Sequence, residues 1–243
     1  MKIALCLSGL PRAIPEGFDR LLHSFINKYN PDIFIHTWLE NPFQGPWEKI
    51  YTYDERLKQI TDILSLYKPK AISIEKCHIV QSYYTEYESI FFHGNIPAGA
   101  SIMRYIYNPH SMFESVYLAN ELKRKYEIQN NFTYDCVIRC RMDIGLNDTI
   151  EFEKFDMSFI NINHNNIIQR EGPFFEIPDH IAFSSSKNMD DFSDLINKIR
   201  NVLFTLKESS VKVYPELILA KYVNLYSLPV KLVDIPIGDK LVE

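Results

Sequence analysis

The chain has 243 residues, of which 46% are hydrophobic and 23% are charged, enough for one large domain or two small ones. Its formal net charge is -5 at pH 7. Nucleic-acid-binding domains usually carry a basic face, so this charge balance argues against a nucleic-acid partner. No apolar run approaches the length of a transmembrane span, which leaves only peripheral membrane contact open.

The cysteines indicate a reducing compartment. No two of them have C-x-x-C spacing, so the sequence predicts no zinc site. Most lie in apolar, strand-like runs, where buried free thiols are the simplest interpretation, and such thiols fit a cytoplasmic location. The cysteines are Cys6, Cys77, Cys136 and Cys140. Residues 1–12 resemble a signal peptide only superficially, because their apolar part is short and ends in a Pro-Arg turn.

The first part of the chain alternates between predicted strands and helices. Residues 2–7 and 32–38 are apolar runs typical of strands buried on both faces of a parallel sheet. Between them, residues 15–29 have helical spacing, and their proline suits a first helical turn. A helix at 54–67 and a strand at 70–75 continue the alternation. Short β-α-β connections predict an α/β fold with a mostly parallel, Rossmann-like sheet flanked by helices.

The middle of the chain has an irregular segment before a long helix. Residues 78–108 are rich in tyrosine and phenylalanine without clean periodicity, and we expect an irregular segment that covers a site. Their Tyr83, Tyr84 and Tyr87 could line a sugar site or close the core. A helix is predicted at 109–127, where basic residues suit the C-terminal end.

The last part of the chain gives weaker patterns. We find no internal repeat, low-complexity segment or linker, so a single domain is expected over residues 1–243. The remaining predicted strands are at 159–162, 181–183 and 230–235, and the remaining predicted helices are at 188–206 and 214–226.

The strand at 134–143, YDCVIRCRMD, carries the strongest functional signal. Side chains alternate between the faces of a strand, so Arg139, Arg141 and Asp143 share one face while the other face is apolar. Three charges on a hydrophobic strand are costly to bury unless they are paired or bound to a ligand. Arginines bind phosphate as bidentate forks, and Mg²⁺ and Mn²⁺ prefer oxygen ligands such as Asp143. The alternative is a structural ion pair between Asp143 and one of the arginines.

Other polar residues are expected at the same edge of the sheet. In open α/β sheets, ligands bind beyond the carboxyl ends of the strands, where residues 8–12, 36–38 and 139–143 should meet. Arg12 is a natural third contact to the base or the phosphates, with a surface arginine as the alternative. Trp38 could stack on a sugar or base, or simply close the core.

Two acidic positions are candidates for acid-base chemistry. Asp179 precedes the short strand at 181–183 and could deprotonate an acceptor hydroxyl, unless it is an ordinary loop aspartate. Glu216 falls in the first turn of a helix, where the helix dipole stabilises a carboxylate in any case. The same glutamate at the edge of the sheet would suit an acceptor contact.

Taken in order, six stretches of the chain resemble GT-A-type glycosyltransferases, most closely those of large DNA viruses and of bacterial capsule or lipopolysaccharide clusters. The R-x-R-x-D element is the most specific of them. The stretches are SGLPR at 8–12, DIFIHTW at 32–38, SMFESVYLANELK at 111–123, YDCVIRCRMD at 134–143, PDHIAFSSSKNM at 178–189 and YPELIL at 214–219.

The resemblance implies a GT-A fold and a UDP- or GDP-sugar donor, used with Mn²⁺ or Mg²⁺. It also implies transfer of a hexose or related sugar to a glycan or glycoprotein acceptor, as in polysaccharide biosynthesis in a bacterial or virus-infected cytoplasm. Residues 1–143 would form the nucleotide-binding half and residues 144–243 the acceptor-side half.

The resemblance assigns roles to individual residues. Asp143 matches the last aspartate of the DXD-type metal element, but Arg141 stands where that element has another aspartate. Asp179 matches an acceptor-side carboxylate and is the expected base, with Glu216 as a second catalytic carboxylate. Arg12, Arg139 and Arg141 match basic positions around the nucleotide. Independently of the resemblance, we expect Ser8, Gly9 and Ser111 as further nucleotide or phosphate contacts and His36, Trp38 and His180 as sugar or acceptor contacts.

Two other functions stay open at this point. The first is a non-catalytic module on the same fold that binds a nucleotide-sugar or a glycan. The second is a Rossmann-like methyltransferase, although its usual glycine-rich turn after the first strand is missing. The sequence contains no G-x-G-x-x-G fingerprint, no Walker A lysine motif and no G-x-S-x-G elbow, so it supports neither a dinucleotide site nor a hydrolase triad.

Overall fold

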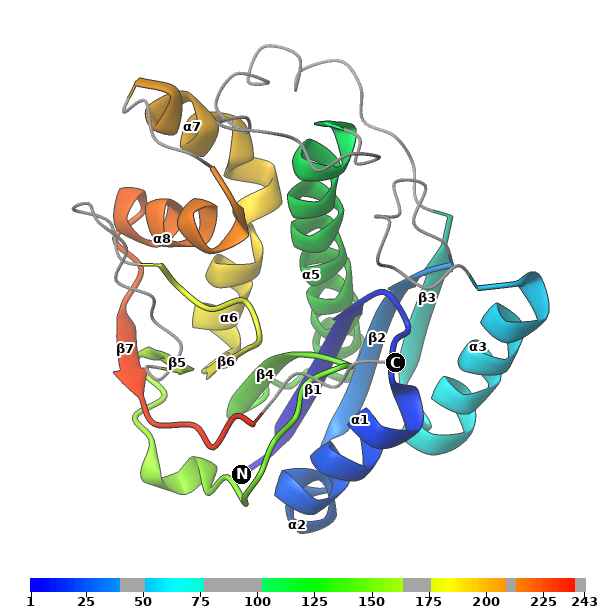
Figure 1. Cartoon of the computed structure of the whole chain (residues 1–243). Coiled ribbons are helices and arrows are strands. Elements are labelled where there is room, and N and C mark those ends of the chain that lie inside the picture. Colours follow the sequence, from blue (N-terminus) through cyan, green and yellow to red (C-terminus); the bar gives the residue numbers. More distant parts are fainter. Residues whose placement is uncertain (40–50, 77–101, 164–175, 209–212, 239–243) are drawn as a thin grey trace.

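The computed structural model describes residues 1–39, 51–76, 102–163, 176–208 and 213–238. Its seven strands form one sheet in the order β3-β2-β1-β4-β6-β5-β7 (Figure 1). The strands are β1 (Ile3–Gly9), β2 (Asp32–Trp38), β3 (Ala71–Glu75), β4 (Cys136–Arg141), β5 (Ile160–Asn163), β6 (Ile181–Ser184) and β7 (Val230–Val233).

The sheet is mixed but mostly parallel. β3, β2, β1 and β4 run parallel to one another, and β5 runs parallel to β7. Only β6 runs against its two neighbours, β4 and β5. The predicted α/β class and mostly parallel sheet are therefore confirmed, and the arrangement is compatible with a Rossmann-like fold.

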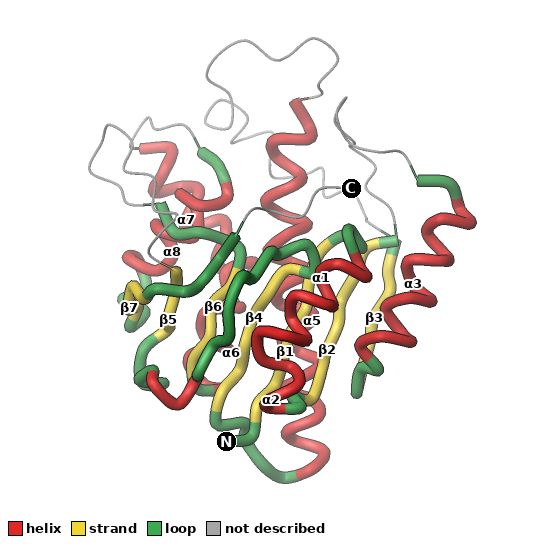
Figure 2. The backbone as a smooth tube through the Cα atoms, turned by 60° about the horizontal axis from the view of Figure 1, so that its bottom comes forward, coloured by secondary structure: helices red, strands yellow, loops and turns green. Residues whose placement is uncertain are grey.

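Helices lie on both sides of this sheet, and the views in Figures 1 and 2 both show this arrangement. One side carries α1 (Ile14–Leu21), a π-helical turn (Leu22–Ile26), α2 (Asn27–Tyr29) and α3 (Tyr53–Tyr67). The other side carries α5 (Ile102–Asn130), α6 (Ser186–Ser193), α7 (Leu195–Glu208) and α8 (Pro215–Leu225). A short 3₁₀ helix (Phe152–Lys154) connects β4 to β5.

The sheet separates two hydrophobic cores, and strand alternation explains how they form. In β1, Leu5 and Leu7 pack into the core under α1 and α3, whereas Ala4 and Cys6 pack into the core under α5 and α6. The predicted burial of free thiols is confirmed for the three cysteines within the described residues, and Cys77 lies outside those residues. These are Cys6, Cys136 and Cys140.

Two helix boundaries differ from the predicted ones. The helix expected at 188–206 is two helices, because Asp194 ends α6 and its side chain then accepts a hydrogen bond from the Asn197 amide in α7. The long helix begins at Ile102 rather than at Pro109, so the proline lies inside α5, where it has no N–H for the helical hydrogen bond. Of the segment expected to be irregular, residues 102–108 are therefore helical, and Tyr83, Tyr84 and Tyr87 lie outside the described residues.

A buried ion cluster joins α5 to α6. The Lys123 ammonium is fully buried, 2.7 Å from Asp190 Oδ1 and 3.0 Å from Glu127 Oε2, and it donates to Ser186 Oγ at 2.6 Å. The other Glu127 carboxylate oxygen accepts the backbone N–H of Tyr134 at 2.8 Å. This cluster therefore fixes the chain just before β4, the strand that carries the two arginines.

Removing the lysine of this cluster should destabilise the fold. Lys123→Met leaves two carboxylates without their buried cation, and we expect the free energy of unfolding to fall by about 3 kcal/mol in a urea titration. Lys125→Met, on the exposed side of the same helix, is the control and should change it by less than about 0.5 kcal/mol. Equal effects for the two variants would show that the cluster does not stabilise the fold.

Candidate functional site

Parallel strands bring three polar segments to one edge of the sheet. β1 and β4 are paired in register so that Ser8 lies beside Arg141, and β2 pairs with β1 so that Ser8 also lies beside His36. The carboxyl ends of these strands therefore meet, as the sequence predicts.

The antiparallel direction of β6 adds a fourth segment to this edge. Because β6 runs against β4, its first residue, Ile181, lies opposite Cys140, and the backbone N–H of Arg141 donates to the His180 carbonyl at 3.2 Å. Asp179 and His180 consequently lie next to the end of β4.

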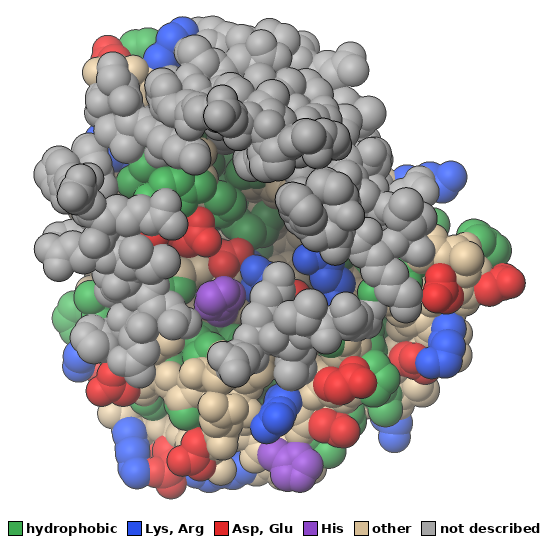
Figure 3. Space-filling view, in the orientation of Figure 1, with side chains coloured by type: hydrophobic (Ala, Val, Ile, Leu, Met, Phe, Trp, Pro, Cys, Tyr) green, Lys and Arg blue, Asp and Glu red, His purple; other side chains and the backbone are tan. Residues whose placement is uncertain are grey.

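These segments surround a cavity of about 410 Å³. Basic, acidic and histidine side chains gather in the hollow near the centre of the face shown in Figure 3. The cavity brings together eleven of the twelve predicted site residues: Ser8, Gly9, Arg12, Trp38, Ser111, Arg139, Arg141, Asp143, Asp179, His180 and Glu216. Its other lining residues were not singled out from the sequence: Leu10, Asn108, Met112 and Pro215.

His36 is the predicted site residue that does not line the cavity. Its side chain is fully buried, and its Nδ1 lies 2.7 Å from Ser115 Oγ in α5. The same hydroxyl accepts the backbone N–H of Gly9 at 2.8 Å. Gly9 has a φ of 112°, a conformation that favours glycine. His36 and Ser115 thus support the backbone at the end of β1. The prediction that His36 contacts a sugar or acceptor is not supported by this buried position.

Arg141 is the centre of an ion cluster at the cavity wall. Its Nε and Nη2 each donate at 2.8 Å to a different oxygen of Asp143, and its Nη1 donates to Asp179 Oδ2 at 3.3 Å. Burial works to lower the pKa of Arg141, but the two carboxylates outweigh it and raise that pKa. Asp143 lies in the turn just after β4, so the predicted alternative of an ion pair between Asp143 and Arg141 is present.

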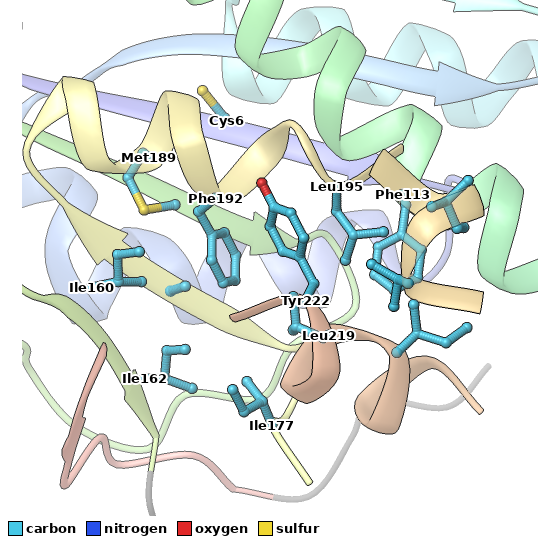
Figure 4. Close-up of a cluster of buried hydrophobic side chains, with 14 of the residues drawn as sticks. Cys6, Phe113, Ile160, Ile162, Ile177, Met189, Phe192, Leu195, Leu219 and Tyr222 are labelled. Carbon is cyan, nitrogen blue, oxygen red and sulfur yellow. The ribbon is translucent and has the colours of Figure 1, made fainter. Parts of the chain in front are cut away.

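Arg139 has a different environment. Its side chain is buried, and its Nη1 donates to the backbone carbonyl of Asp179. It also adjoins a small void lined by side chains from four helices, including Phe113, Phe192 and Leu219, which Figure 4 shows converging. Burial lowers the pKa of this guanidinium, although the negative charge of Asp179 acts to raise it. A buried cation with a neutral carbonyl as its hydrogen-bond partner is energetically costly.

Three buried polar atoms on residues that line the cavity have no hydrogen-bond partner within the described residues. They are Ser8 Oγ, Arg139 Nε and His180 Nδ1. Buried donors and acceptors are nearly always paired in folded proteins, and the Tyr67 hydroxyl and Asn161 Oδ1 are in the same situation away from the cavity. The three atoms are therefore compatible with either a ligand or an ordered water as their partner. Two of the three are donors that suit an anion, as a hydroxyl and a guanidinium N–H.

The two predicted catalytic carboxylates differ in their ionisation. Burial would raise the pKa of Asp179, but Arg141, Arg139 and His180 outweigh it and the pKa is lowered. Burial raises the pKa of Glu216, and Asp179 and Glu176 raise it further. Burial also lowers the pKa of His180, which keeps its ring neutral near pH 7. Glu216 is therefore better suited than Asp179 to accept a proton.

The side chains at Asp143 do not fit the predicted Mn²⁺ or Mg²⁺ site. Both carboxylate oxygens already accept from one guanidinium, and a divalent ion placed on them would lie against that positive charge. Asp179 is held by the same arginine. In the part of the chain that the structure describes, no three His, Cys, Asp or Glu side chains are grouped as a metal site.

Gly17 supports the site in a way that the sequence analysis did not identify. A Cβ at this position of α1 would overlap the backbone carbonyl of Met142, the residue between Arg141 and Asp143. A glycine inside a helical pattern was the available signal, because such a glycine often marks a close approach.

Sequence comparisons give no family assignment. A scan against models of known protein families finds no match to this chain, and a search of curated proteins finds none either. Among the described residues, no helix combines the length and apolar character needed to cross a membrane.

Adding a methyl group at Gly17 should disturb the turn that holds Asp143. Alanine has the better helix propensity by roughly 1 kcal/mol, but here its Cβ must displace the Met142 backbone, which we expect to cost more. Gly17→Ala should therefore lower the free energy of unfolding in urea. Gly238→Ala is the control, since its Cβ meets only the side chain of Asn147. A Gly17→Ala variant as stable as the wild type would contradict this close packing.

Proposed function

We propose that this chain is a glycosyltransferase that moves a sugar from a UDP- or GDP-sugar to a hydroxyl of a glycan or other acceptor. The observation that carries the proposal is Arg139, a buried guanidinium hydrogen-bonded to a carbonyl on the wall of an open cavity. Such a cation calls for an anionic ligand, and the Ser8 hydroxyl, buried beside the cavity with no partner among the described residues, would be a second donor.

The cavity suits a nucleotide-sugar in size and composition. Its volume of about 410 Å³ falls within the range of roughly 300 to 1,000 Å³ typical of small-molecule sites. Arg12, Arg139 and Arg141 are the basic groups for a diphosphate, while Met112 gives apolar surface for a base or sugar. Trp38 borders the cavity but is buried, and its indole N–H donates to the Ser111 carbonyl at 3.0 Å, so it closes the core as the alternative prediction has it. The resemblance to GT-A-type glycosyltransferases points to the same ligand class.

Glu216 is the proposed base. It lies in the first turn of α8, lines the cavity and has a raised pKa, so it is a stronger base than an ordinary glutamate. The acceptor oxygen forms a bond to the anomeric carbon as its proton passes to Glu216. The bond from that carbon to the diphosphate oxygen breaks, and its electron pair stays on the leaving diphosphate.

Asp179 has a positioning role in this proposal. Its carboxylate accepts from Arg141 and its carbonyl accepts from Arg139, so one residue orients both guanidinium groups. Its lowered pKa makes it a weak base compared with Glu216.

Binding without turnover is the second candidate function. Arg141 pairs with both Asp143 and Asp179, so Glu216 is the cavity carboxylate that pairs with no arginine among the described residues. A single carboxylate left for chemistry also suits a module that binds its ligand without turnover. A methyltransferase is less favoured, because S-adenosylmethionine has a sulfonium cation and no phosphate to offset Arg139.

A panel of nucleotide-sugars tests the proposal directly. We expect at least one UDP- or GDP-sugar to release its nucleoside diphosphate, and glycan acceptors to raise the rate. Binding of UDP or GDP with no release from any donor would favour the binding module. Thermal stabilisation by S-adenosylmethionine, with none by either nucleotide, would contradict the proposal.

Replacing the proposed base should lower the rate of the chemical step. We expect Glu216→Gln to reduce kcat by about a hundredfold or more with little change in the donor KM. Glu16→Gln is a matched control, since Glu16 also follows a proline in the first turn of a helix but lies on the exposed surface. The variant and the control should have the same stability.

The pH dependence should identify the same residue. Because the carboxylate form is the base and its pKa is raised, activity should increase with pH through a value above the ordinary glutamate pKa. This rise on the acidic side of the pH–activity profile, its acidic limb, should disappear in Glu216→Gln and persist in His180→Gln. Loss of the limb in the histidine variant alone would assign the base to His180.

A further inference from the structure

We infer that Arg141, held by Asp143, takes the place of a divalent metal at this site, so that the nucleotide binds without one. This inference rests on the proposed function, because it concerns how the diphosphate of the donor is neutralised. The R-x-R-x-D pattern predicts that Asp143 binds a metal ion. In this inference Asp143 instead orients the guanidinium of Arg141.

The geometry of the pair supports this role for Asp143. The two oxygens of its carboxylate each accept one N–H of the same guanidinium at 2.8 Å, the bidentate arrangement that fixes an arginine most strongly. The carboxylate itself is nearly fully buried, with 6% of its side chain exposed. A metal would have to displace this contact or share the oxygens with a positive group.

Arg141 retains donors for a ligand. A guanidinium has five N–H groups, and its contacts to Asp143 and Asp179 use three of them, so two remain. The side chain is 22% exposed and lines the cavity, so these two are on a group that a ligand can reach. Arg139 adds a buried N–H at Nε that has no partner in the part of the chain that the structure describes.

Oriented donors, and not net charge, suit this site to a diphosphate, because Arg139 and Arg141 together only balance Asp143 and Asp179. Asp143 and Asp179 hold Arg141 in place, and Arg139 has no described carboxylate within 4 Å to offset it. When the bond to the anomeric carbon breaks, the electron pair stays on the diphosphate oxygen. The charge that develops there is offset by fixed guanidinium groups, which are already oriented before the donor binds.

Nucleotide titrations with and without metal test the inference on the full chain. UDP and GDP are titrated by calorimetry in EDTA and again in millimolar Mn²⁺ or Mg²⁺. We expect the better nucleotide to bind with dissociation constants that agree within about twofold across these conditions. Binding that is tighter by about tenfold or more with metal, and lost in EDTA, would overturn the inference and leave the proposed function standing. No binding of either nucleotide under any condition would overturn the proposed function and the inference together.

The Asp143→Asn variant separates the two roles of the aspartate. An amide can still accept from Arg141 but is a poor metal ligand, so we expect the affinity for UDP or GDP to fall by no more than about tenfold, equally in EDTA and Mn²⁺. Loss of a metal-dependent part of the affinity would contradict the inference. Asp148→Asn, an exposed aspartate five residues further on, is the control. If Asp143→Asn does not fold, the wild-type titrations decide the question alone.

Discussion

Two arginine side chains at the end of one buried strand govern the electrostatics of this protein. Neighbouring positions on one face of β4 carry Arg139 and Arg141, and a sheet interior does not tolerate an uncompensated charge. Arg141 is compensated by Asp143 in the next turn and by Asp179 before β6. Arg139 is compensated only in part, by a backbone carbonyl. Arg141 is thus oriented by its carboxylates before a ligand binds, whereas Arg139 depends more on an anionic ligand to offset its charge.

Contacts from the surrounding helices and strands position these two arginines and their partners. The antiparallel β6 is what places Asp179 beside β4, and α1 approaches the turn at Met142 closely enough to require Gly17. On the other side of the sheet, Ser115 of α5 ties the β1 turn to His36, and the Lys123 cluster fixes the chain before β4. The cavity is thus built on rigid elements, as a preorganised site requires.

Much of this arrangement was predictable from sequence. Strand alternation placed Arg139 and Arg141 on one face, and the rule for parallel sheets brought them to the same edge as Arg12 and Trp38. Both inferences use local periodicity and one topological rule. The α/β class followed from the same patterns.

Other features depended on contacts between distant segments. The pairing of Arg141 with Asp179 arises from the direction of β6, which no local pattern gives. His36 has the right strand position for the site, but α5 covers it through Ser115. The break between α6 and α7 arises from a capping contact of Asp194 that the hydrophobic spacing does not reveal.

The most direct test of the account is the stability of Arg139→Met with and without UDP or GDP. If Arg139 is a buried cation kept for an anionic ligand, a methionine of similar length should leave the unliganded protein as stable or more stable. The variant should also lose the stabilisation that the nucleotide gives to the wild type. A variant that is less stable by several kcal/mol and is still stabilised by the nucleotide would contradict the central claim, because Arg139 would then serve the fold and not the ligand.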